Sequence, residues 1–271
     1  MKNKIAFIGA GKMATAIVKG LIRDNVYSPD SILCTCGNDS TGTLLANETG
    51  ITFTDTIEPY LKNINILVLA CKPQQIGQID LTSFQDNDIT ADLTIISILA
   101  GTTIDRLRMY FKNSKYIIRT MPNTPGQIGF GSTAFASSVD LDKKTLSHLE
   151  NILGSLGSIY QVKESEMDAI TALSGSGPAY VFEFISALSQ GGISVGLDPI
   201  IAKKLAIETI IGSAKLLEES GHESEDLRDA VTSKGGTTEV ALKVLGSGGF
   251  KNLVIEAIQK AKDHSLKLSK S

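Results

Sequence analysis

The sequence contains no long apolar run, which excludes one class of protein at once. No segment of its 271 residues approaches the roughly 18 consecutive apolar residues that a transmembrane helix needs. The basic residues Lys2 and Lys4 are followed by an apolar run, residues 5–8, that is far too short for the core of a signal peptide. We therefore expect a cytoplasmic protein with no membrane partner.

An excess of positive charge is also lacking. Lys and Arg number 26 against 29 Asp and Glu, so the formal net charge at pH 7 is −3. The sequence has no basic run and no basic patch interleaved with aromatic residues, and so we expect no nucleic-acid partner. It has no internal repeat and no low-complexity tract. Its 42% of hydrophobic residues is ordinary for a folded soluble protein.

Cysteine is scarce, and its positions exclude two kinds of stabilisation. An odd number of cysteines, Cys34, Cys36 and Cys71, argues against a disulfide framework. The pair Cys34 and Cys36 has neither the spacing nor the second ligand pair of a zinc site, so we expect no metal. We interpret the three side chains as small buried hydrophobic groups.

The first 162 residues alternate short β-branched runs with polar segments of helical length. Several of the runs are apolar throughout, as expected for strands covered by helices on both sheet faces. Strands separated by helices predict right-handed crossovers and a doubly wound, Rossmann-type α/β sheet. The link before residues 130–136 is so short that this strand should be antiparallel to its neighbour. The predicted strands are residues 4–8, 31–36, 51–53, 64–70, 93–99, 115–120, 130–136 and 158–162.

After about residue 164 the pattern becomes entirely helical. We therefore divide the chain into an α/β domain, residues 1–163, and an all-helical C-terminal domain, residues 164–271. The long helices are rich in Ala, Ile, Leu and Gly, which is typical of helices that bury against a second chain. We expect a homodimer at least. The predicted helices are residues 167–173, 178–195, 198–219, 223–232, 237–245 and 252–268.

A glycine motif follows the first predicted strand. Gly9 permits a tight turn, Gly11 lets the backbone approach a pyrophosphate, and Ala14 allows close packing of the next helix on the strand. The amino end of that helix then faces the phosphates. Because the motif stands at the first turn of a doubly wound fold, we predict a dinucleotide site.

The end of the second predicted strand bears on the choice between NADP and NAD. An acidic residue closing this strand would hold the ribose 2′-hydroxyl and repel a 2′-phosphate. Here Asn38 follows the strand and Asp39 comes later, which favours NADP and leaves NAD possible. Thr35, Asn38 and Lys12 are the candidate partners of the 2′-phosphate.

The turn at residues 233–238, Ser-Lys-Gly-Gly-Thr-Thr, lies between two predicted helices. Its paired glycines can orient successive amides into one concavity, and the following helix adds unpaired N–H groups and the positive end of its dipole. Such a turn suits a small carboxylate. The alternative is a simple helix–helix turn with Ser and Thr as caps.

Two other predicted loops end near the same sheet edge. Lys72 follows the fourth strand, where it would meet a phosphate or ribose or else be solvated. The loop after the sixth strand carries Pro122 and Pro125 around a polar dipeptide. It would form a wall of the nicotinamide pocket or only a rigid connection.

Together these motifs resemble those of pyrroline-5-carboxylate reductases, which complete proline synthesis. The resemblance rests on residues 8–14, 70–74, 119–125, 171–180 and 227–238 and covers almost the whole chain. It implies that the helical domain interlocks with that of a second subunit and completes its active site. Dimers of this family also assemble into larger rings.

The resemblance also implies roles for individual residues. The residues implied to bind NADP, or NAD, are Ile8, Gly9, Ala10, Gly11, Lys12, Met13, Ala70, Lys72, Pro73, Leu99, Ala100 and Gly101. Those that would contact the substrate, 1-pyrroline-5-carboxylate, are Met121, Pro122, Asn123, Ser233, Gly235, Gly236, Thr237 and Thr238. Thr238 would act catalytically beside the ring nitrogen, by hydrogen bonding it or by relaying a proton from water.

The sequence departs from the family pattern in three places, one of which is the end of the second predicted strand, where the usual serine or arginine is not evident. Lys234 stands where proline is usual, and Ile57 stands where asparagine is common, so that Asp55 or Thr56 would have to make that contact. None of the three histidines, His148, His222 and His264, stands in an apolar context, and each is expected to be solvated. An imine can be protonated in solution before it binds, and so a strong general acid is not required.

Two other functions fit the same architecture. One is a different small-acid dehydrogenase or imine reductase, such as a 3-hydroxyacid dehydrogenase. Those enzymes usually carry a catalytic lysine on the helix between domains, and the helix after Pro178 has none, which counts against this alternative. The other is a non-catalytic regulatory paralogue, for which the departures at Ile57 and Lys234 leave room.

Overall fold

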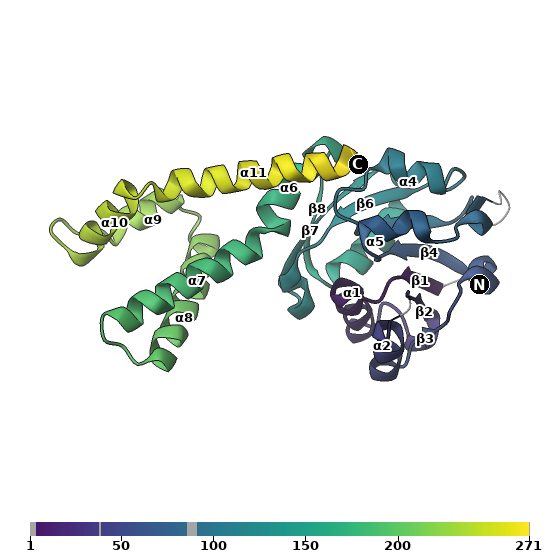
Figure 1. Cartoon of the computed structure of the whole chain (residues 1–271), viewed down its shortest axis with the longest axis horizontal. Helices are drawn as coiled ribbons and strands as arrows, with labels where there is room; N and C mark the ends of the chain where they lie inside the picture. The colour runs from purple at the N-terminus through teal and green to yellow at the C-terminus, as the bar shows by residue number, and fades with distance from the viewer. Residues whose placement is uncertain (1–3, 38, 86–90, 271) are drawn as a thin grey trace. The chain divides into compact units, whose positions relative to one another are not determined.

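The computed structural model describes residues 4–37, 39–85 and 91–270, and it contains the predicted α/β sheet followed by helices. Within these residues the first part of the chain forms an eight-stranded sheet in the order β3-β2-β1-β4-β5-β6-β7-β8 (Figure 1). Each strand begins and ends within a residue or two of its predicted position. The strands are β1 (Lys4–Ile8), β2 (Ile32–Thr35), β3 (Thr52–Phe53), β4 (Ile64–Leu69), β5 (Thr94–Ser97), β6 (Ile117–Met121), β7 (Gly131–Ser137) and β8 (Gly157–Gln161).

The pairing of the strands creates a switch point between β1 and β4. Strands β1 to β6 are parallel, with β2 and β3 on one side of β1 and β4 to β6 on the other. The strand order therefore reverses beside β1, which is where open α/β sheets bind ligands, at the carboxyl ends of their strands. Strand β7 is antiparallel to β6, as predicted, and β8 is parallel to β7.

Two apolar clusters cover the two faces of the sheet. Because successive side chains of a strand point to opposite faces, Ile5 and Phe7 of β1 belong to one cluster and Ala6 and Ile8 to the other. Residues of α1 (Lys12–Arg23), α2 (Thr41–Thr49) and α5 (Lys143–Gly154) complete the first cluster. Residues of α4 (Ile104–Tyr110) and α6 (Met167–Ile170) belong to the second.

The remaining helices follow the punctuation of the sequence. Asp198 caps the start of α8, where its carboxylate accepts hydrogen bonds from the amides of Ile200 (2.9 Å) and Ile201 (3.2 Å). Gly221 ends that helix in the left-handed conformation, with φ of 67°. A π-helical turn, Thr171–Gly175, precedes α7. These helices are α7 (Gly177–Ser194), α8 (Pro199–Ser220), α9 (Ser224–Ala230), α10 (Thr237–Ser247) and α11 (Phe250–Lys270).

The chain forms two compact units. The first contains the residues up to Ser176 together with those from Ala261 onward, and the second contains Gly177–Lys260. Helix α11 thus begins in the second unit and ends in the first. The predicted division between residues 163 and 164 is also one of function, with NAD(P) binding before it and dimerisation and substrate binding after it. This division stays a prediction.

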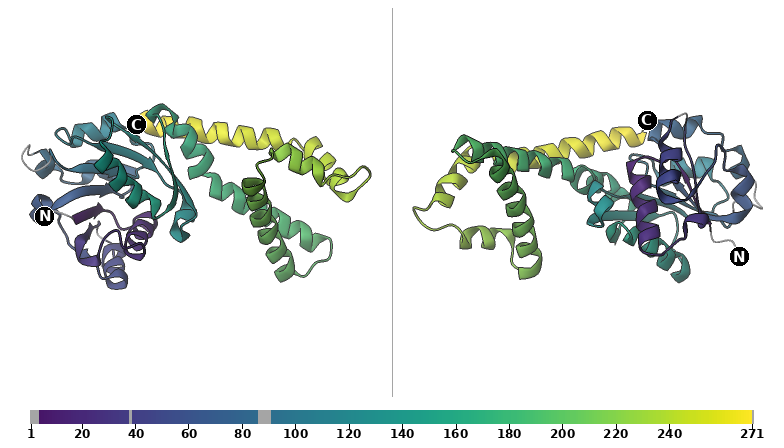
Figure 2. Two further views of the ribbon diagram at one scale, coloured as in Figure 1. Left: turned by 180° about the vertical axis from the view of Figure 1, so that it is seen from behind. Right: turned by 90° about the horizontal axis from the view of Figure 1, so that it is seen from below.

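The second unit consists of helices with little apolar core of their own. Its helices α7 and α8 pack against each other (Figure 2), and Ala202 and Ala206 of α8 are buried. Larger apolar side chains of this unit are exposed, among them Ile200 at 79% and Val244 at 65%. Among the described residues, no helix is both long enough and apolar enough to cross a membrane. Apolar helix surface of this extent is typical of a protein–protein interface.

Candidate functional site

A cavity of about 940 Å³ opens beside the switch point, at the carboxyl ends of β1, β2 and β4. The structure therefore gathers at one place residues that are separated by more than sixty positions in the sequence. The predicted nucleotide-binding residues that line it are Ile8, Gly9, Ala10, Gly11, Thr35, Ala70 and Lys72.

Gly9 lines this cavity and packs closely against the backbone that follows β4. Its φ is 106°, and its amide donates a hydrogen bond to the Thr35 carbonyl at 2.7 Å. A Cβ atom on Gly9 would lie 2.5 Å from backbone atoms of Ala70 and Cys71. The backbone conformation and this close approach of β1 to β4 both require glycine here.

Gly11 and the first turn of α1 provide the donors. Gly11 is the N-cap of α1, no side chain caps the helix, and a Cβ on Gly11 would meet no atom within 4 Å. The first amides of a helix have no acceptor within the helix, and the helix dipole places partial positive charge beside them. Open space in front of uncapped amides fits a pyrophosphate, and so the residues present fit a bound dinucleotide.

The end of β2 places the three candidate partners of a 2′-phosphate differently, and Thr35 alone of them lines the cavity among the described residues. The Thr35 hydroxyl donates to the Asp55 carbonyl at 3.1 Å, Lys12 is exposed and does not line the cavity, and Asn38 lies outside the described residues. Asp39 does line the cavity. Hydrogen bonds from Thr41 lower the pKa of Asp39, and the charge of Lys72 contributes to the same shift.

The turn after β5 packs elsewhere in the first unit. Leu99 is buried, and a Cβ on Gly101 would lie 3.0 Å from the Cβ of Leu268 near the end of α11. Residues 99–101 therefore pack beside the last turns of α11, and they do not line the cavity, nor do Met13 and Pro73. Their predicted contacts with a nucleotide remain untested.

The loop after β6 is joined to the π-helical turn. The Asn123 amide group donates to the Ser174 carbonyl at 3.1 Å and accepts from the Ser132 amide at 2.9 Å. Pro122 is buried, and a Cβ on Gly175 would collide with the end of Met121. The Asn123 side chain thus fixes this loop, whatever else the loop contacts.

The turn before α10 has the conformation that an anion site needs. Gly235 has φ of 74°, and the Gly236 amide donates to the Ser233 carbonyl at 3.0 Å. Helix α10 then begins at Thr237 with no side-chain cap. Ser233, Lys234 and Thr237 are exposed, and Thr238 is half-buried. Uncapped first-turn amides beside these hydroxyls suit a small carboxylate.

Sequence reasoning missed Glu239 in this turn. Its carboxylate accepts a hydrogen bond from the Gly235 amide at 2.6 Å and lies 2.9 Å from the Lys243 ammonium. Both contacts lower the pKa of Glu239, with Lys243 the larger cause. The only signal in the sequence was an acidic residue in the first turn of a helix, which is common at helix starts.

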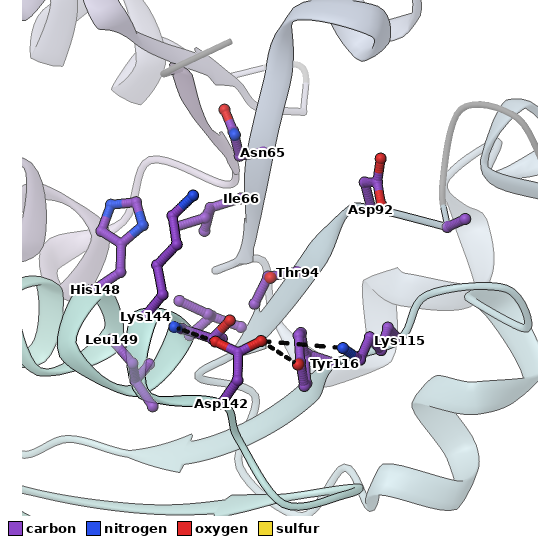
Figure 3. A pocket seen from close by; sticks show the side chains of 13 residues that line it. Asn65, Ile66, Asp92, Thr94, Lys115, Tyr116, Asp142, Lys144, His148 and Leu149 are labelled. Atoms are coloured by element: carbon purple, nitrogen blue, oxygen red, sulfur yellow. Dashed lines mark hydrogen bonds and ion pairs between the residues drawn. The ribbon is translucent and has the colours of Figure 1, made fainter. Parts of the chain in front are cut away.

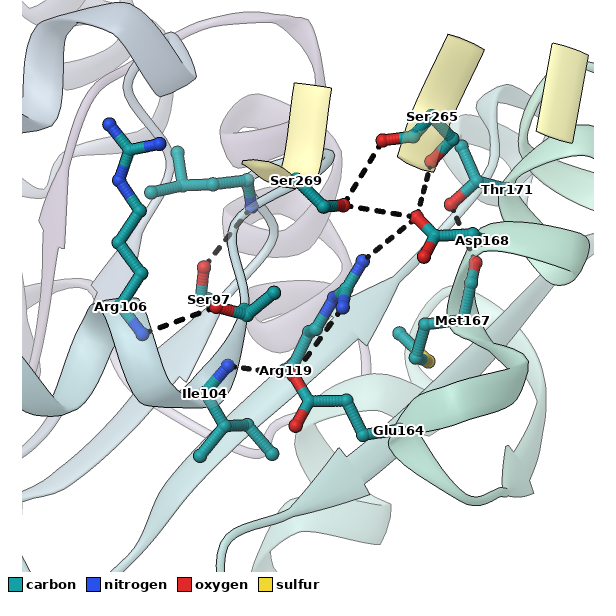
Figure 4. Close-up of polar contacts among 12 residues, drawn as sticks. Ser97, Ile104, Arg106, Arg119, Glu164, Met167, Asp168, Thr171, Ser265 and Ser269 are labelled. Atoms are coloured by element: carbon teal, nitrogen blue, oxygen red, sulfur yellow. Dashed lines mark hydrogen bonds and ion pairs between the residues drawn. The ribbon is translucent and has the colours of Figure 1, made fainter. Parts of the chain in front are cut away.

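A buried ionic cluster, the Asp168 cluster, was also missed (Figure 4). Arg119 of β6 is 3% exposed, and its guanidinium donates to Glu164 (3.4 Å) and to Asp168 (3.5 Å). The same oxygen of Asp168 accepts from the hydroxyls of Ser265 (2.6 Å) and Ser269 (3.2 Å). These five residues lie in the first compact unit and tie the last turns of α11 to the sheet.

A second cavity, of about 280 Å³, lies at the amino ends of β4, β5 and β6 (Figure 3). Asp142 there accepts from the Tyr116 hydroxyl at 2.6 Å and the Thr145 amide at 2.8 Å, which lower the pKa of Asp142 to about 2. His148 shares a hydrogen bond with the Tyr27 hydroxyl at 2.7 Å, and burial lowers its pKa. The expectation of a solvated His148 was wrong, because α5 packs beside α1 and brings Tyr27 to it.

The comparisons with known proteins agree over the whole chain. Residues 164–268 match the family model described as pyrroline-5-carboxylate reductase dimerisation, and residues 4–101 match one described as NADP oxidoreductase coenzyme F420-dependent. A pyrroline-5-carboxylate reductase of Synechocystis sp. is 35% identical over 272 residues, which cover 100% of both chains.

Two solved structures are similar over the same extent. A pyrroline-5-carboxylate reductase of Coxiella burnetii has a TM-score of 0.88 and 34% identity, covering 100% of both chains. A pyrroline carboxylate reductase of Plasmodium falciparum, solved with NADP bound, has a TM-score of 0.88 and 30% identity, covering 99% of both. With a full-length relative above 30% identity, the chain belongs to the pyrroline-5-carboxylate reductase family.

Proposed function

We propose that this protein is an NADP-dependent pyrroline-5-carboxylate reductase that converts 1-pyrroline-5-carboxylate to L-proline. The observation that carries the proposal is the uncapped, left-handed turn at residues 233–238, which suits a carboxylate, in a chain that also has a dinucleotide cradle at Gly9 and Gly11. Its role is then proline biosynthesis.

The reaction adds a hydride to the carbon of the C=N bond and leaves a proton on the ring nitrogen. When bound, the reduced dinucleotide supplies the hydride. Gly9 and Gly11 hold its pyrophosphate against the first turn of α1, and Ala70 and Lys72 line the same cavity. We assign the other predicted cofactor contacts, including Met13, Pro73 and residues 99–101, to the same role on the strength of the family resemblance alone.

The chain's task toward the substrate is orientation. The amides of Thr237 and Thr238, at the uncapped start of α10, face the carboxylate, and the Ser233 hydroxyl adds a donor. Holding the anion fixes the ring, so that Thr238 hydrogen-bonds the ring nitrogen or passes it a proton from water. Residues 121–123 wall the pocket, held in place by the Asn123 bonds.

We also propose self-association through the helices of the second unit. These helices expose apolar side chains such as Ile200 and Val244. The unit buries little apolar surface by itself, and an exposed apolar surface of this kind is typical of an interface with another protein. A second copy of the chain would cover these side chains, and dimers would then combine into a ring. The division of tasks between residues 1–163 and 164–271 is part of this proposal.

The proposed activity is tested by following the oxidation of NADPH with 1-pyrroline-5-carboxylate, with NADH in parallel. We expect substrate-dependent oxidation and L-proline as the product. Oxidation with a 3-hydroxyacid but not with the imine would instead identify a different dehydrogenase. Nucleotide binding without turnover of either would identify a non-catalytic paralogue.

A further inference from the structure

The nucleotide cavity is strongly acidic for a site that receives a phosphorylated ligand. Among the described residues that line it, four carry carboxylates, Asp39, Asp55, Glu58 and Asp80, and one, Lys72, carries a positive charge. The two backbone phosphates of a dinucleotide would be met by the uncharged amides of Ala10, Gly11 and the first turn of α1. The NADP 2′-phosphate adds up to two further negative charges, which this cavity must accommodate.

Asp39 is the first acidic residue after β2 in the sequence. It lies between Thr35, the last residue of β2, and α2, and its carboxylate accepts from the Thr41 amide at 2.9 Å. Asp39 and Thr41 both line the cavity. The end of the second strand is where doubly wound folds place the adenosine ribose. A carboxylate there accepts hydrogen bonds from ribose hydroxyls and repels a phosphate.

Glu58 contributes a second carboxylate to this cavity. Together with Asp39 it forms part of the acidic lining that a 2′-phosphate would meet.

We propose that Asp39 is the residue that restrains binding of the 2′-phosphate, and so sets the ratio in which the chain uses NADPH and NADH. This rests on the proposed function only in taking the cavity as the dinucleotide site. NADP still binds, because the amides of Ala10, Gly11 and the first turn of α1 hold the pyrophosphate of either cofactor. Removal of the Asp39 charge should favour the phosphorylated ligand selectively.

The test uses the full chain and two adenosine fragments, adenosine 2′,5′-bisphosphate and AMP, with Kd measured by calorimetry. In Asp39→Asn the side-chain carbonyl still accepts from Thr41, so the turn is kept. We expect the bisphosphate to bind about tenfold more tightly and AMP to bind no more tightly than before. The kcat/KM ratio of NADPH to NADH should rise by a similar factor.

The chain offers a matched control in Asp80→Asn. Asp80 lines the same cavity and accepts from the Thr82 amide at 3.0 Å and the Thr82 hydroxyl at 2.7 Å, the arrangement that Asp39 has with Thr41. Asp80→Asn should change the ratio of the two Kd values, for the bisphosphate and for AMP, by less than about twofold, because Asp80 does not adjoin β2. Equal shifts in the two variants, or no shift in Asp39→Asn, would overturn the assignment.

The outcome is separable from the proposed activity. Fragment binding involves no imine, so the Asp39 effect can appear in a protein that does not reduce 1-pyrroline-5-carboxylate. Reduction of the imine with an unchanged NADPH-to-NADH ratio in Asp39→Asn would retain the proposed function and reject the role of Asp39. Failure of wild-type protein to bind either fragment would reject both the cavity as the nucleotide site and this role.

Discussion

Gly9 and Gly11 are two positions apart, yet a side chain would meet different surroundings at each. At Gly9 it would collide with the backbone of β4 and would require a left-handed φ, whereas at Gly11 it would project into open space. Glycine at position 9 is therefore needed by the protein's own fold. Glycine at position 11 is needed by what approaches from outside.

This difference predicts that two alanine substitutions both weaken nucleotide binding but that only one of them lowers the stability of the fold. Gly9→Ala should lower the free energy of unfolding by about 1–3 kcal/mol because it forces strain into the β1 turn, and it should weaken nucleotide binding as a consequence. Gly11→Ala should weaken NADP binding while leaving the unfolding midpoint unchanged. Urea unfolding and calorimetric titration with NADP measure the two effects. A stable Gly9→Ala protein with normal NADP affinity would contradict the argument.

Single residues also explain why part of the site escaped prediction. Ile57 departs from the family pattern, and the structure buries it to 2% exposure in an apolar cluster while it also lines the cavity. Its side chain is thus part of the core, which a single sequence cannot distinguish from a lost polar contact. Lys234 is exposed, and nothing in the structure explains why it replaces proline.

At the scale of the element, the start of α10 depends on its own third residue. The Glu239 carboxylate accepts a hydrogen bond from the Gly235 amide, and the Lys243 ammonium, one turn later, pairs with that carboxylate. The left-handed Gly235 is thereby fixed, and with it the direction of the next amides. A turn held in its binding conformation before the substrate arrives loses less entropy on binding.

We therefore expect Glu239→Ala to raise KM for 1-pyrroline-5-carboxylate about five- to tenfold with a much smaller change in kcat. Glu239→Gln keeps an acceptor for the Gly235 amide and should restore most of the affinity. NADP binding should be unaffected in both Glu239 variants, because the nucleotide cavity belongs to the first compact unit and Glu239 to the second. The matched control is Glu208→Ala, which removes a similar pair with Lys204 (3.9 Å) but touches no turn. A loss of kcat alone would refute the positioning role.

The Asp168 cluster fixes a second element, the last turns of α11, to the sheet. Asp168→Ala would leave the buried Arg119 guanidinium with only its 3.4 Å contact to Glu164 and would remove the carboxylate to which Ser265 and Ser269 donate. We expect a loss of about 3–5 kcal/mol in the free energy of unfolding. Glu48→Ala, which breaks the exposed pair with Lys19, should change it by less than about 1 kcal/mol. Urea unfolding at one protein concentration compares them, and equal losses would show that the cluster has no special weight.

The sequence predicted elements well and their polar links poorly. Strand positions followed from apolar runs such as residues 64–70, because burial on both sides leaves a pattern that a single sequence displays. The sequence singled out Gly9 and Gly235, and at both positions the backbone has a positive φ that favours glycine. The Asp168 cluster was not, because Arg119 and Ser265 are far apart in sequence and neither belongs to a local pattern.

At the scale of the whole molecule, the exposed apolar helices and the match to the dimerisation model both support self-association. The resemblance implies that the carboxylate turn of one subunit serves the nucleotide cleft of the other. A protein built this way can recover activity when two inactive variants are combined, because a mixed dimer still contains one intact cleft facing one intact turn.

That arrangement is tested by mixing Gly9→Ala with Gly235→Val, a variant that cannot hold the left-handed turn. Each alone should be nearly inactive, and subunit exchange should restore about a quarter of wild-type activity, because half of randomly paired dimers are mixed and each has one working site. Mixing each inactive variant with itself is the control. No recovery after verified exchange would place the turn and the cleft of one site in the same subunit.

The two serines that bind Asp168 belong to the last turns of α11, whereas Asp168 itself precedes the second unit. During synthesis the ribosome makes the sheet first, then residues 177–260, and only then the segment from Ala261 onward. Domains fold as they emerge from the ribosome. The sheet is therefore without these two serines for as long as the helical unit is being synthesised. The polar anchor of Asp168 is completed only when that last stretch of chain has left the exit tunnel.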